Sequence, residues 1–274
     1  MRTWPAIDVQ VSGPDEADLL EAFFLDHDLA AIEEPAPDAR RYFFRTGAAR
    51  DAALPALRLA FPALAPSAAD IDDEDWVARS QAALTAVRVG AITVAPPWAA
   101  GDPDPLTLVI RPAMGFGTGH HATTRLCLRA LQALTPAGCT VLDVGTGSGV
   151  LAIAASRLGA ARVDGVDDDP DALAAAQDNL VLNPGARVTF AVADFRTLRH
   201  APVDVLLANL TGALLVAGAP VLSGLVRPGG ALILSGFPVE GTAEVRAAFA
   251  AASVADETRE DEWAALLLYT PNGP

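Results

Sequence analysis

Residues 143–149 read Asp-Val-Gly-Thr-Gly-Ser-Gly, and these seven residues are the strongest indication of the fold. It follows the apolar run 140–142 and precedes a helix-like apolar run from Val150 to Leu158. Glycines permit a tight turn and a close approach of ligand to backbone, and the N-terminus of the following helix offers free N–H groups. A strand, a glycine turn and a helix in this order predict a nucleotide-binding α/β fold.

The spacing of Gly145, Gly147 and Gly149 selects among nucleotide ligands. It is G-x-G-x-G, whereas dinucleotide-binding folds have G-x-G-x-x-G. Asp143 stands at the strand end, where a carboxylate would repel a pyrophosphate but suits a cationic ligand. S-adenosylmethionine carries a sulfonium and an ammonium group, so the pattern favours this cofactor.

A second acidic position supports the nucleotide reading. The strand-like run Arg162 to Val166 ends in Asp167-Asp168-Asp169-Pro170, about twenty residues past the glycines. In doubly wound folds an acidic residue at this place binds ribose hydroxyls. Asp167 is the candidate. A glycine cluster alone would also fit an ordinary loop, and the second strand with its aspartate argues against that alternative.

Charge and composition limit the classes of partner. The chain of 274 residues is 51% hydrophobic, has a formal net charge of −15, and contains arginine but no lysine. Such a field repels nucleic acid and attracts basic partners. The alternative is that the acidic surplus serves solubility only, or reflects genomic composition or a salty habitat.

Three features bear on location and metal or redox chemistry. The N-terminal residues 1–8 lack a long apolar run, so we expect no signal peptide and a cytoplasmic protein. Cys127 and Cys139 have no metal-ligand spacing and are expected to be reduced core residues. The apolar stretch Val203 to Val226 is long enough for a membrane span, but Asn209 and Pro220 divide it into a buried strand and a helix.

The chain is expected to form two domains joined by a linker. Residues 1–72 have the strand and helix order β-α-β-β-α-β, which is typical of a small ferredoxin-like domain. Residues 73–88 are predicted to form a helical linker with an acidic first turn. Strands and helices alternate over residues 89–274, which predicts a doubly wound, Rossmann-like α/β domain. Its expected strands are 140–144, 162–166, 187–192, 203–208, 231–235 and 264–269.

A loop with three glycines precedes the helix before the predicted strand 140–144. Residues 114–124 read Met-Gly-Phe-Gly-Thr-Gly-His-His-Ala-Thr-Thr and are predicted to cover a ligand, with Thr123 or Thr124 capping the next helix. Phe116, Thr118 and His121 are its candidate functional residues. The adjacent histidines have no carboxylate or cysteine at a suitable spacing, so no metal site is expected.

Asn209 follows the predicted strand 203–208. The C-terminal ends of parallel strands form the ligand crevice, and an amide can both donate and accept hydrogen bonds there. The alternative is a simple turn residue. Asn209 is not followed by Pro-Pro-Tyr, the pattern of enzymes that methylate exocyclic or amide nitrogens.

Taken together, these residues resemble the bacterial ribosomal protein methyltransferases of the PrmA type, which modify the eleventh protein of the large ribosomal subunit. The similarity runs through these segments: 73–76 (Asp-Glu-Asp-Trp), 95–98 (Ala-Pro-Pro-Trp), 116–121 (Phe-Gly-Thr-Gly-His-His), 143–149 and 209–210 (Asn-Leu). The resemblance implies a class I methyltransferase domain with a mostly parallel seven-stranded sheet. It also implies that S-adenosylmethionine contacts these residues: Thr124, Gly145, Asp167 and Asn209.

The resemblance further implies that the N-terminal domain recognises the protein substrate, a basic ribosomal protein taken free rather than assembled. The sequence departs from the family where Ser80-Gln81 replaces a frequent Trp-Lys pair and Ala122 replaces a frequent proline. These departures concern substrate engagement more than cofactor binding.

Methyl transfer from a sulfonium needs alignment and exclusion of water rather than a covalent residue. We therefore expect Asn209 and the loop from Phe116 to His121 to orient an α-amino or lysine ε-amino group. Two alternatives stay open: a methyltransferase for another protein lysine or a small-molecule amine, and a non-catalytic module that only binds S-adenosylmethionine. Nucleic acid and membranes are not expected partners.

Overall fold

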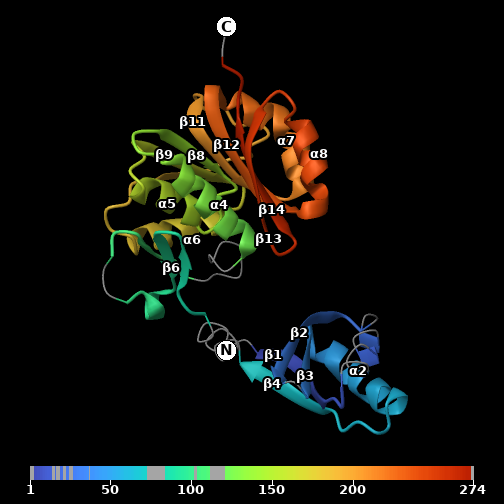
Figure 1. Cartoon of the computed structure of the whole chain (residues 1–274). Helices are drawn as coiled ribbons and strands as arrows, with labels where there is room; N and C mark the ends of the chain where they lie inside the picture. The colour runs from blue at the N-terminus through green and yellow to red at the C-terminus, as the bar shows by residue number, and fades with distance from the viewer. Residues whose placement is uncertain are drawn as a thin grey trace. The chain divides into compact units, whose positions relative to one another are not determined.

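The computed structural model describes residues 3–13, 16, 19–20, 23–24, 27–36, 38–72, 84–101, 104–111 and 121–272 (Figure 1). The chain divides into two compact units, residues 1–84 and 85–274. The predicted linker over 73–88 lies mostly outside the described residues. Its last two residues, 87 and 88, instead begin a strand, because Val87 and Val89 pair with the strand that follows Gly90.

The first unit is built on a four-stranded antiparallel sheet in the order β2-β3-β1-β4. Its described elements are β1 (Thr3–Gln10), β2 (Leu29–Ala36), β3 (Ala39–Phe44), α2 (Gly47–Ala60) and β4 (Ser67–Asp72). This strand order and pairing are those of a ferredoxin-like sheet. The first helix of the predicted β-α-β-β-α-β order, expected between β1 and β2, falls largely outside the described residues.

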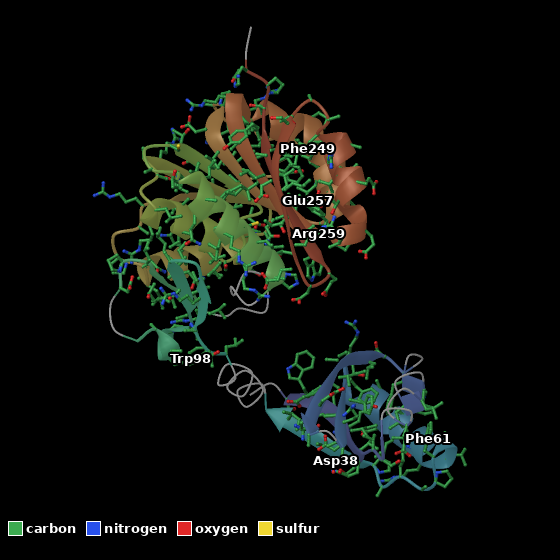
Figure 2. The ribbon with its side chains drawn as sticks, in the orientation of Figure 1. Asp38, Phe61, Trp98, Phe249, Glu257 and Arg259 are labelled. Atoms are coloured by element: carbon green, nitrogen blue, oxygen red, sulfur yellow. The ribbon has the colours of Figure 1, made fainter. Side chains whose placement is uncertain are left out.

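Helix α2 packs on this sheet through Ala53 and Leu57, which are fully buried. Thr46 caps the helix by accepting a hydrogen bond from the backbone N–H of Ala49 at 3.1 Å. Phe61, labelled in Figure 2, follows the last residue of the helix and packs against the same core.

The second unit contains a seven-stranded sheet in the order β10-β9-β8-β11-β12-β14-β13. The first five strands in this order are parallel, and β14 is antiparallel to both of its neighbours. The strands are β8 (Thr140–Val144), β9 (Arg162–Asp167), β10 (Thr189–Val192), β11 (Val203–Asn209), β12 (Val226–Pro238), β13 (Ser253–Glu260) and β14 (Trp263–Tyr269). The predicted doubly wound, mostly parallel sheet is confirmed.

Helices cover both faces of this sheet (Figure 1). One face carries α4 (Ala122–Leu134), α5 (Val150–Arg157) and α6 (Pro170–Val181), and the other carries α7 (Gly212–Gly224) and α8 (Thr242–Ala248). Phe249, at the end of α8, is buried against the second face (Figure 2). The apolar stretch 203–226 forms β11 and α7 as predicted, and no described helix has the length and apolar character of a membrane span.

A small three-stranded sheet adjoins the α4 side of the core. It consists of β5 (Val87–Val89), β6 (Ile92–Ala95) and β7 (Thr107–Val109), with the short 3-10 helix η1 (Pro97–Ala99) after β6. A second 3-10 helix, η2 (Val239–Gly241), follows β12. Strands β5, β6, β7 and β13 were not predicted from the sequence.

Candidate functional site

The topology of the large sheet places the site between β8 and β11. These neighbouring parallel strands are followed by α5 and α7, which lie on opposite faces of the sheet. The chain therefore leaves the two strand ends in opposite directions, and ligands bind at such a switch point in α/β folds. The glycine turn 145–149 and Asn209 both lie at this edge.

The glycine turn has the backbone conformation that its sequence predicts. Gly145, Gly147 and Gly149 have φ angles of +69°, +52° and +79°, a region that residues with a Cβ atom rarely adopt. The backbone N–H groups of Gly145 and Thr146 donate to the carbonyl of Val166 at 2.9 and 3.0 Å. The turn is thereby fixed to the end of β9.

Asp167 joins β9 to the glycine turn through its side chain. Its Oδ2 accepts a hydrogen bond from the N–H of Gly147 at 2.9 Å, and its Oδ1 accepts one from the N–H of Asp169 at 3.1 Å. Each carboxylate oxygen retains a further lone pair that can accept a hydroxyl. Asp167 thus lies beside the glycine turn, as predicted, with acceptor capacity for a ribose.

Three polar side chains share the face of the sheet that α4 covers. Asp143, Asn209 and Ser235 each lie two residues beyond a core residue of that face, and side chains two residues apart in a strand point the same way. Asn209 pairs in register with Ser235 on β12, and Asp143 pairs with Leu207, two residues before Asn209. They form one polar layer at the carboxyl ends of neighbouring strands.

Asp143 is the acidic residue of this layer, and its pKa is strongly raised. Burial raises its pKa to about 7, although hydrogen bonds from the Thr146 hydroxyl at 2.7 Å and the N–H of Ala152 at 3.2 Å favour the charged form. Both bonds reach Oδ2. Oδ1 is buried and has no hydrogen-bond partner among the described residues.

Helix α4 brings a second buried oxygen to the same face. Thr124 is 1% exposed, and its hydroxyl oxygen has no hydrogen-bond partner within the described ranges. One turn later the thiol of Cys127 hydrogen-bonds Ser235 and lies close enough to Asp143 that burial and this carboxylate both raise the pKa of the thiol. Thr124 therefore belongs to the helical face that packs over the polar layer.

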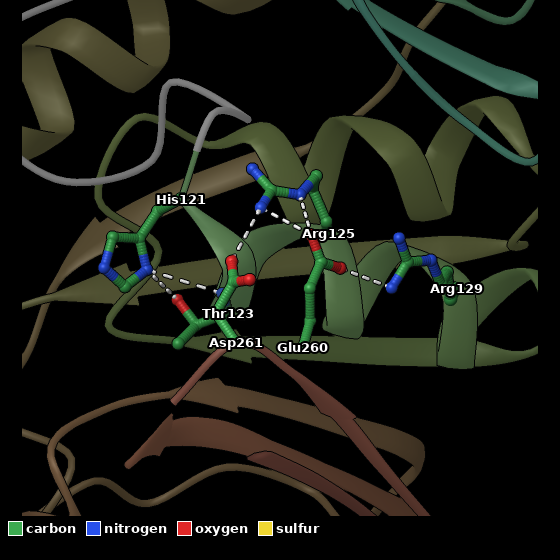
Figure 3. A network of polar contacts seen from close by, with 6 residues as sticks. All are labelled: His121, Thr123, Arg125, Arg129, Glu260 and Asp261. Carbon is green, nitrogen blue, oxygen red and sulfur yellow. Dashed lines mark hydrogen bonds and ion pairs between the residues drawn. The ribbon is translucent and has the colours of Figure 1, made fainter. Parts of the chain in front are cut away.

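The helix begins earlier than the sequence suggested, so the predicted capping by Thr123 or Thr124 is wrong. His121 is the N-cap residue, and both threonines lie inside the first turn. Nδ1 of His121 accepts from the N–H of Thr123 at 3.4 Å and contacts its hydroxyl at 2.8 Å (Figure 3). An imidazole nitrogen replaces a hydroxyl as the cap acceptor, which leaves Thr124 Oγ1 available to a ligand.

Leu210, which follows Asn209, lies against two glycines, Gly145 and Gly236. This contact was not predicted from the sequence. A Cβ atom on Gly145 would lie 2.4 Å from Cδ2 of Leu210, and one on Gly236 would lie 2.3 Å from its carbonyl oxygen. Gly236 also has a φ angle of +94°. Gly236 directly follows the predicted strand 231–235, and this position was the available signal for the contact, which fixes the backbone that follows Asn209.

The remaining predicted site residues divide into two groups. Phe116 and Thr118 lie outside the described residues. His121 is described, and its ring packs edge-on against Trp263, with ring centroids 4.7 Å apart. Among the described residues, no group of histidine, cysteine, aspartate or glutamate side chains has the geometry to hold a metal ion.

Comparison with known proteins agrees with this geometry. The family model for ribosomal protein L11 methyltransferase (PrmA) matches residues 49–270. The chain is 45% identical to the ribosomal protein L11 methyltransferase of Pseudomonas aeruginosa strain LESB58 over 195 residues, which are 70% of this chain and 66% of that protein. It is 41% identical to the protein of the same name from Geobacter metallireducens over 209 residues, covering 74% of this chain and 68% of the relative.

A solved structure gives the same result for the fold. The crystal structure of ribosomal protein L11 methylase from Lactobacillus delbrueckii subsp. bulgaricus superposes with a TM-score of 0.64 at 26% identity, over 69% of this chain and all of the other. The sequence matches to the two curated relatives span about two thirds of the length of those proteins. Because the family model covers most of the chain, including the glycine turn and Asn209, the chain belongs to the ribosomal protein L11 methyltransferase family.

Proposed function

We propose that the protein is an S-adenosylmethionine-dependent N-methyltransferase that modifies α-amino and lysine ε-amino groups of ribosomal protein L11. The observation that carries this proposal is the polar layer at the carboxyl ends of β8 and β11. Asp143 Oδ1 in this layer and Thr124 Oγ1 on helix α4, which packs over it, are both buried and have no hydrogen-bond partner among the described residues. Family membership supplies the class of reaction and of substrate.

The residues present fit S-adenosylmethionine. An unpaired carboxylate oxygen beside a turn of positive-φ glycines suits a ligand that is cationic and packs closely on the backbone. Asp143 and Thr124 would hold its amino acid portion, and Asp167 would hold the ribose. When bound, this group supplies a methyl carbon that its sulfonium already activates.

The chain's own residues then have to align the acceptor amine and exclude water. Asn209 ends β11 within the polar layer, and the contacts of Leu210 with Gly145 and Gly236 fix its backbone. We infer that the Asn209 amide, with the segment from Phe116 to His121, orients the amine for in-line attack. The amine must be neutral, which favours an α-amino group with a pKa of about 8 over lysine at about 10.4.

Charge supports a basic substrate taken free in the cytoplasm. The formal net charge of −15 attracts a basic protein and opposes approach to a particle coated with RNA. We assign substrate recognition to the predicted N-terminal domain, residues 1–72, which lies within the first unit. Methylation rates on free L11 and on intact large subunits test this part, and faster methylation of the intact subunits would contradict it.

The test of the reaction itself is transfer of an isotope-labelled methyl group from S-adenosylmethionine to purified L11. We expect incorporation into L11 and none into a control basic protein of similar size. Binding of the cofactor without transfer to L11 would support a non-catalytic module or another amine substrate instead.

A further inference from the structure

The turn of the β13–β14 hairpin is linked to α4 through Glu260, the last residue of β13 (Figure 3). Its Oε1 accepts hydrogen bonds from Arg125, with N···O distances of 2.5 Å, and its Oε2 accepts from Arg129. The two arginines are one helical turn apart on α4, so one carboxylate bridges two successive turns of the helix. Only about a fifth of the Glu260 and Arg125 side chains is exposed (20% and 19%), so water screens this pair weakly.

A second contact joins the same two elements. Trp263, the first residue of β14, packs its ring against His121, the N-cap of α4. Asp261, between the two strands, has a φ angle of +52°, and its carboxylate lies 4.0 Å from Arg125. The hairpin turn therefore contacts α4 at its cap and along its first two turns.

The charge arrangement of α4 explains why this contact matters. The first turn of α4 contains no acidic residue, whereas Arg125 places a cation near the positive end of the helix dipole. Glu260 supplies the missing negative charge from a distant part of the chain. Burial raises the pKa of Glu260, but the hydrogen bonds and charges of Arg125 and Arg129 outweigh it and lower the pKa overall.

We propose that Glu260 is a positioning residue of the cofactor site, which holds the first turns of α4 so that Thr124 faces the layer formed by Asp143 and Asn209. Thr124 directly precedes Arg125 in the sequence, and it lies on the buried face of the helix while Arg125 faces the hairpin. A shift of α4 caused by loss of the contact between Glu260 and Arg125 would therefore also move the Thr124 hydroxyl on the buried face of the helix. The inference rests on the proposed function, because it deepens the description of that site.

The experiment is titration calorimetry of Glu260→Gln with S-adenosylhomocysteine, at a temperature well below its thermal unfolding midpoint. Glutamine keeps the shape and removes the charge. We expect the dissociation constant to rise about tenfold, the lower end of the effect measured for groups that orient metal-binding residues. The matched control is Glu257→Gln on the same strand, since Glu257 pairs with Arg259, and both are labelled in Figure 2. The control should bind like the wild type.

Two further readouts separate positioning from general stability. Near-UV circular dichroism of the Trp263 band, assigned with Trp263→Phe, should change in Glu260→Gln and not in Glu257→Gln. In a background with both Arg125→Gln and Arg129→Gln, the Glu260→Gln change should have a much smaller effect on cofactor affinity, because Glu260 acts on α4 through these two arginines.

The outcomes distinguish this inference from the proposed function. Wild-type affinity in folded Glu260→Gln, even with a lowered unfolding temperature, would overturn the positioning role and leave the function standing. A wild-type protein that binds no S-adenosylhomocysteine would overturn the proposed function, and with it the inference that depends on it.

Discussion

The side chain of Asn179 joins the glycine turn to the segment that follows β7. Its Nδ2 donates a hydrogen bond to the carbonyl of Ser148 at 2.9 Å, and its Oδ1 accepts one from the N–H of Arg111 at 2.8 Å. Asn179 lies on α6 and is only 1% exposed. Asn183, one turn later, bonds both backbone groups of Val109. Asn179 thus fixes the glycine turn directly, and Asn183 strengthens the link between α6 and β7.

Replacement of Asn179 by aspartate should destabilise the protein. The new carboxylate cannot donate to the Ser148 carbonyl and is buried, so we expect a loss of about 2 to 3 kcal/mol in the free energy of unfolding, measured by urea denaturation at neutral pH. Gln177→Glu is the control, because Gln177 is exposed on the same helix. It should change the stability by less than about 0.5 kcal/mol. Equal effects of the two variants would argue against the bridging role.

The raised pKa of Asp143 predicts a pH dependence of stability and of cofactor affinity. Burial raises this pKa from 3.8 to about 7, so the folded protein without cofactor favours the protonated acid. The contribution of Asp143 to stability is therefore full below about pH 4 and is lost as the pH rises through about 7.

A cationic cofactor favours the charged carboxylate, so its affinity should rise as the pH increases through about 7, with release of a proton on binding. Calorimetry in buffers of different ionisation enthalpy measures that proton. The Asp143→Asn variant should bind the cofactor more weakly, and binding should release fewer protons than in the wild type. Proton release that is the same in this variant and the wild type would exclude Asp143 as its source.

The close approach of Leu210 to Gly236 predicts a severe effect of a single methyl group. Gly236→Ala would combine a strained φ angle of +94° with a contact of 2.3 Å to the backbone carbonyl of Leu210. We expect a loss of about 3 kcal/mol and reduced methyl transfer, because the strand end that carries Asn209 must shift. Gly224→Ala, at the end of α7 with open space around it, should be neutral or stabilise the fold by up to about 1 kcal/mol. The prediction fails if both variants unfold at the same denaturant concentration.

Asn209→Ala should separate orientation of the amine from folding. We expect kcat/KM for L11 to fall about 100-fold, the effect of misplacing a reacting group, while the unfolding midpoint changes little. Asn272→Ala provides the control. Asn272 is exposed and lies beside Gly229, near the N-terminal end of β12, so it is far from the carboxyl strand ends that form the site. Unchanged kinetics in Asn209→Ala would exclude this role.

The sequence predicts the central sheet well because its strands are continuous apolar runs bounded by glycine or acidic turns. Residues 140–144 form β8 as predicted, and Asp167 and Asn209 end their strands. Strand β13 was missed because seven of its eight residues (Ser253–Glu260, SVADETRE) are not large apolar residues and it lies at the edge of the sheet. Polar edge strands lack the alternation that identifies a half-buried strand.

Contacts between distant residues account for what else the sequence could not predict. The bridge from Glu260 to Arg125 joins residues 135 positions apart, and no local pattern marks either of them. The helix cap was misplaced because a histidine in the capping position is less typical than the two threonines that follow it. The buried, unpartnered oxygens of Asp143 and Thr124 become visible only when α4 is placed over the sheet.

Mass spectrometry of L11 shows whether this site transfers methyl groups from S-adenosylmethionine to that protein. Purified L11 is incubated with the protein and the cofactor, with Asn209→Ala as the parallel sample, and peptides are mapped. We expect mass increases in steps of one methylene, located at the N-terminal amine or at lysines, and greatly reduced in the variant. An unchanged mass of L11, with the wild-type protein folded and the cofactor bound, would contradict the proposed function.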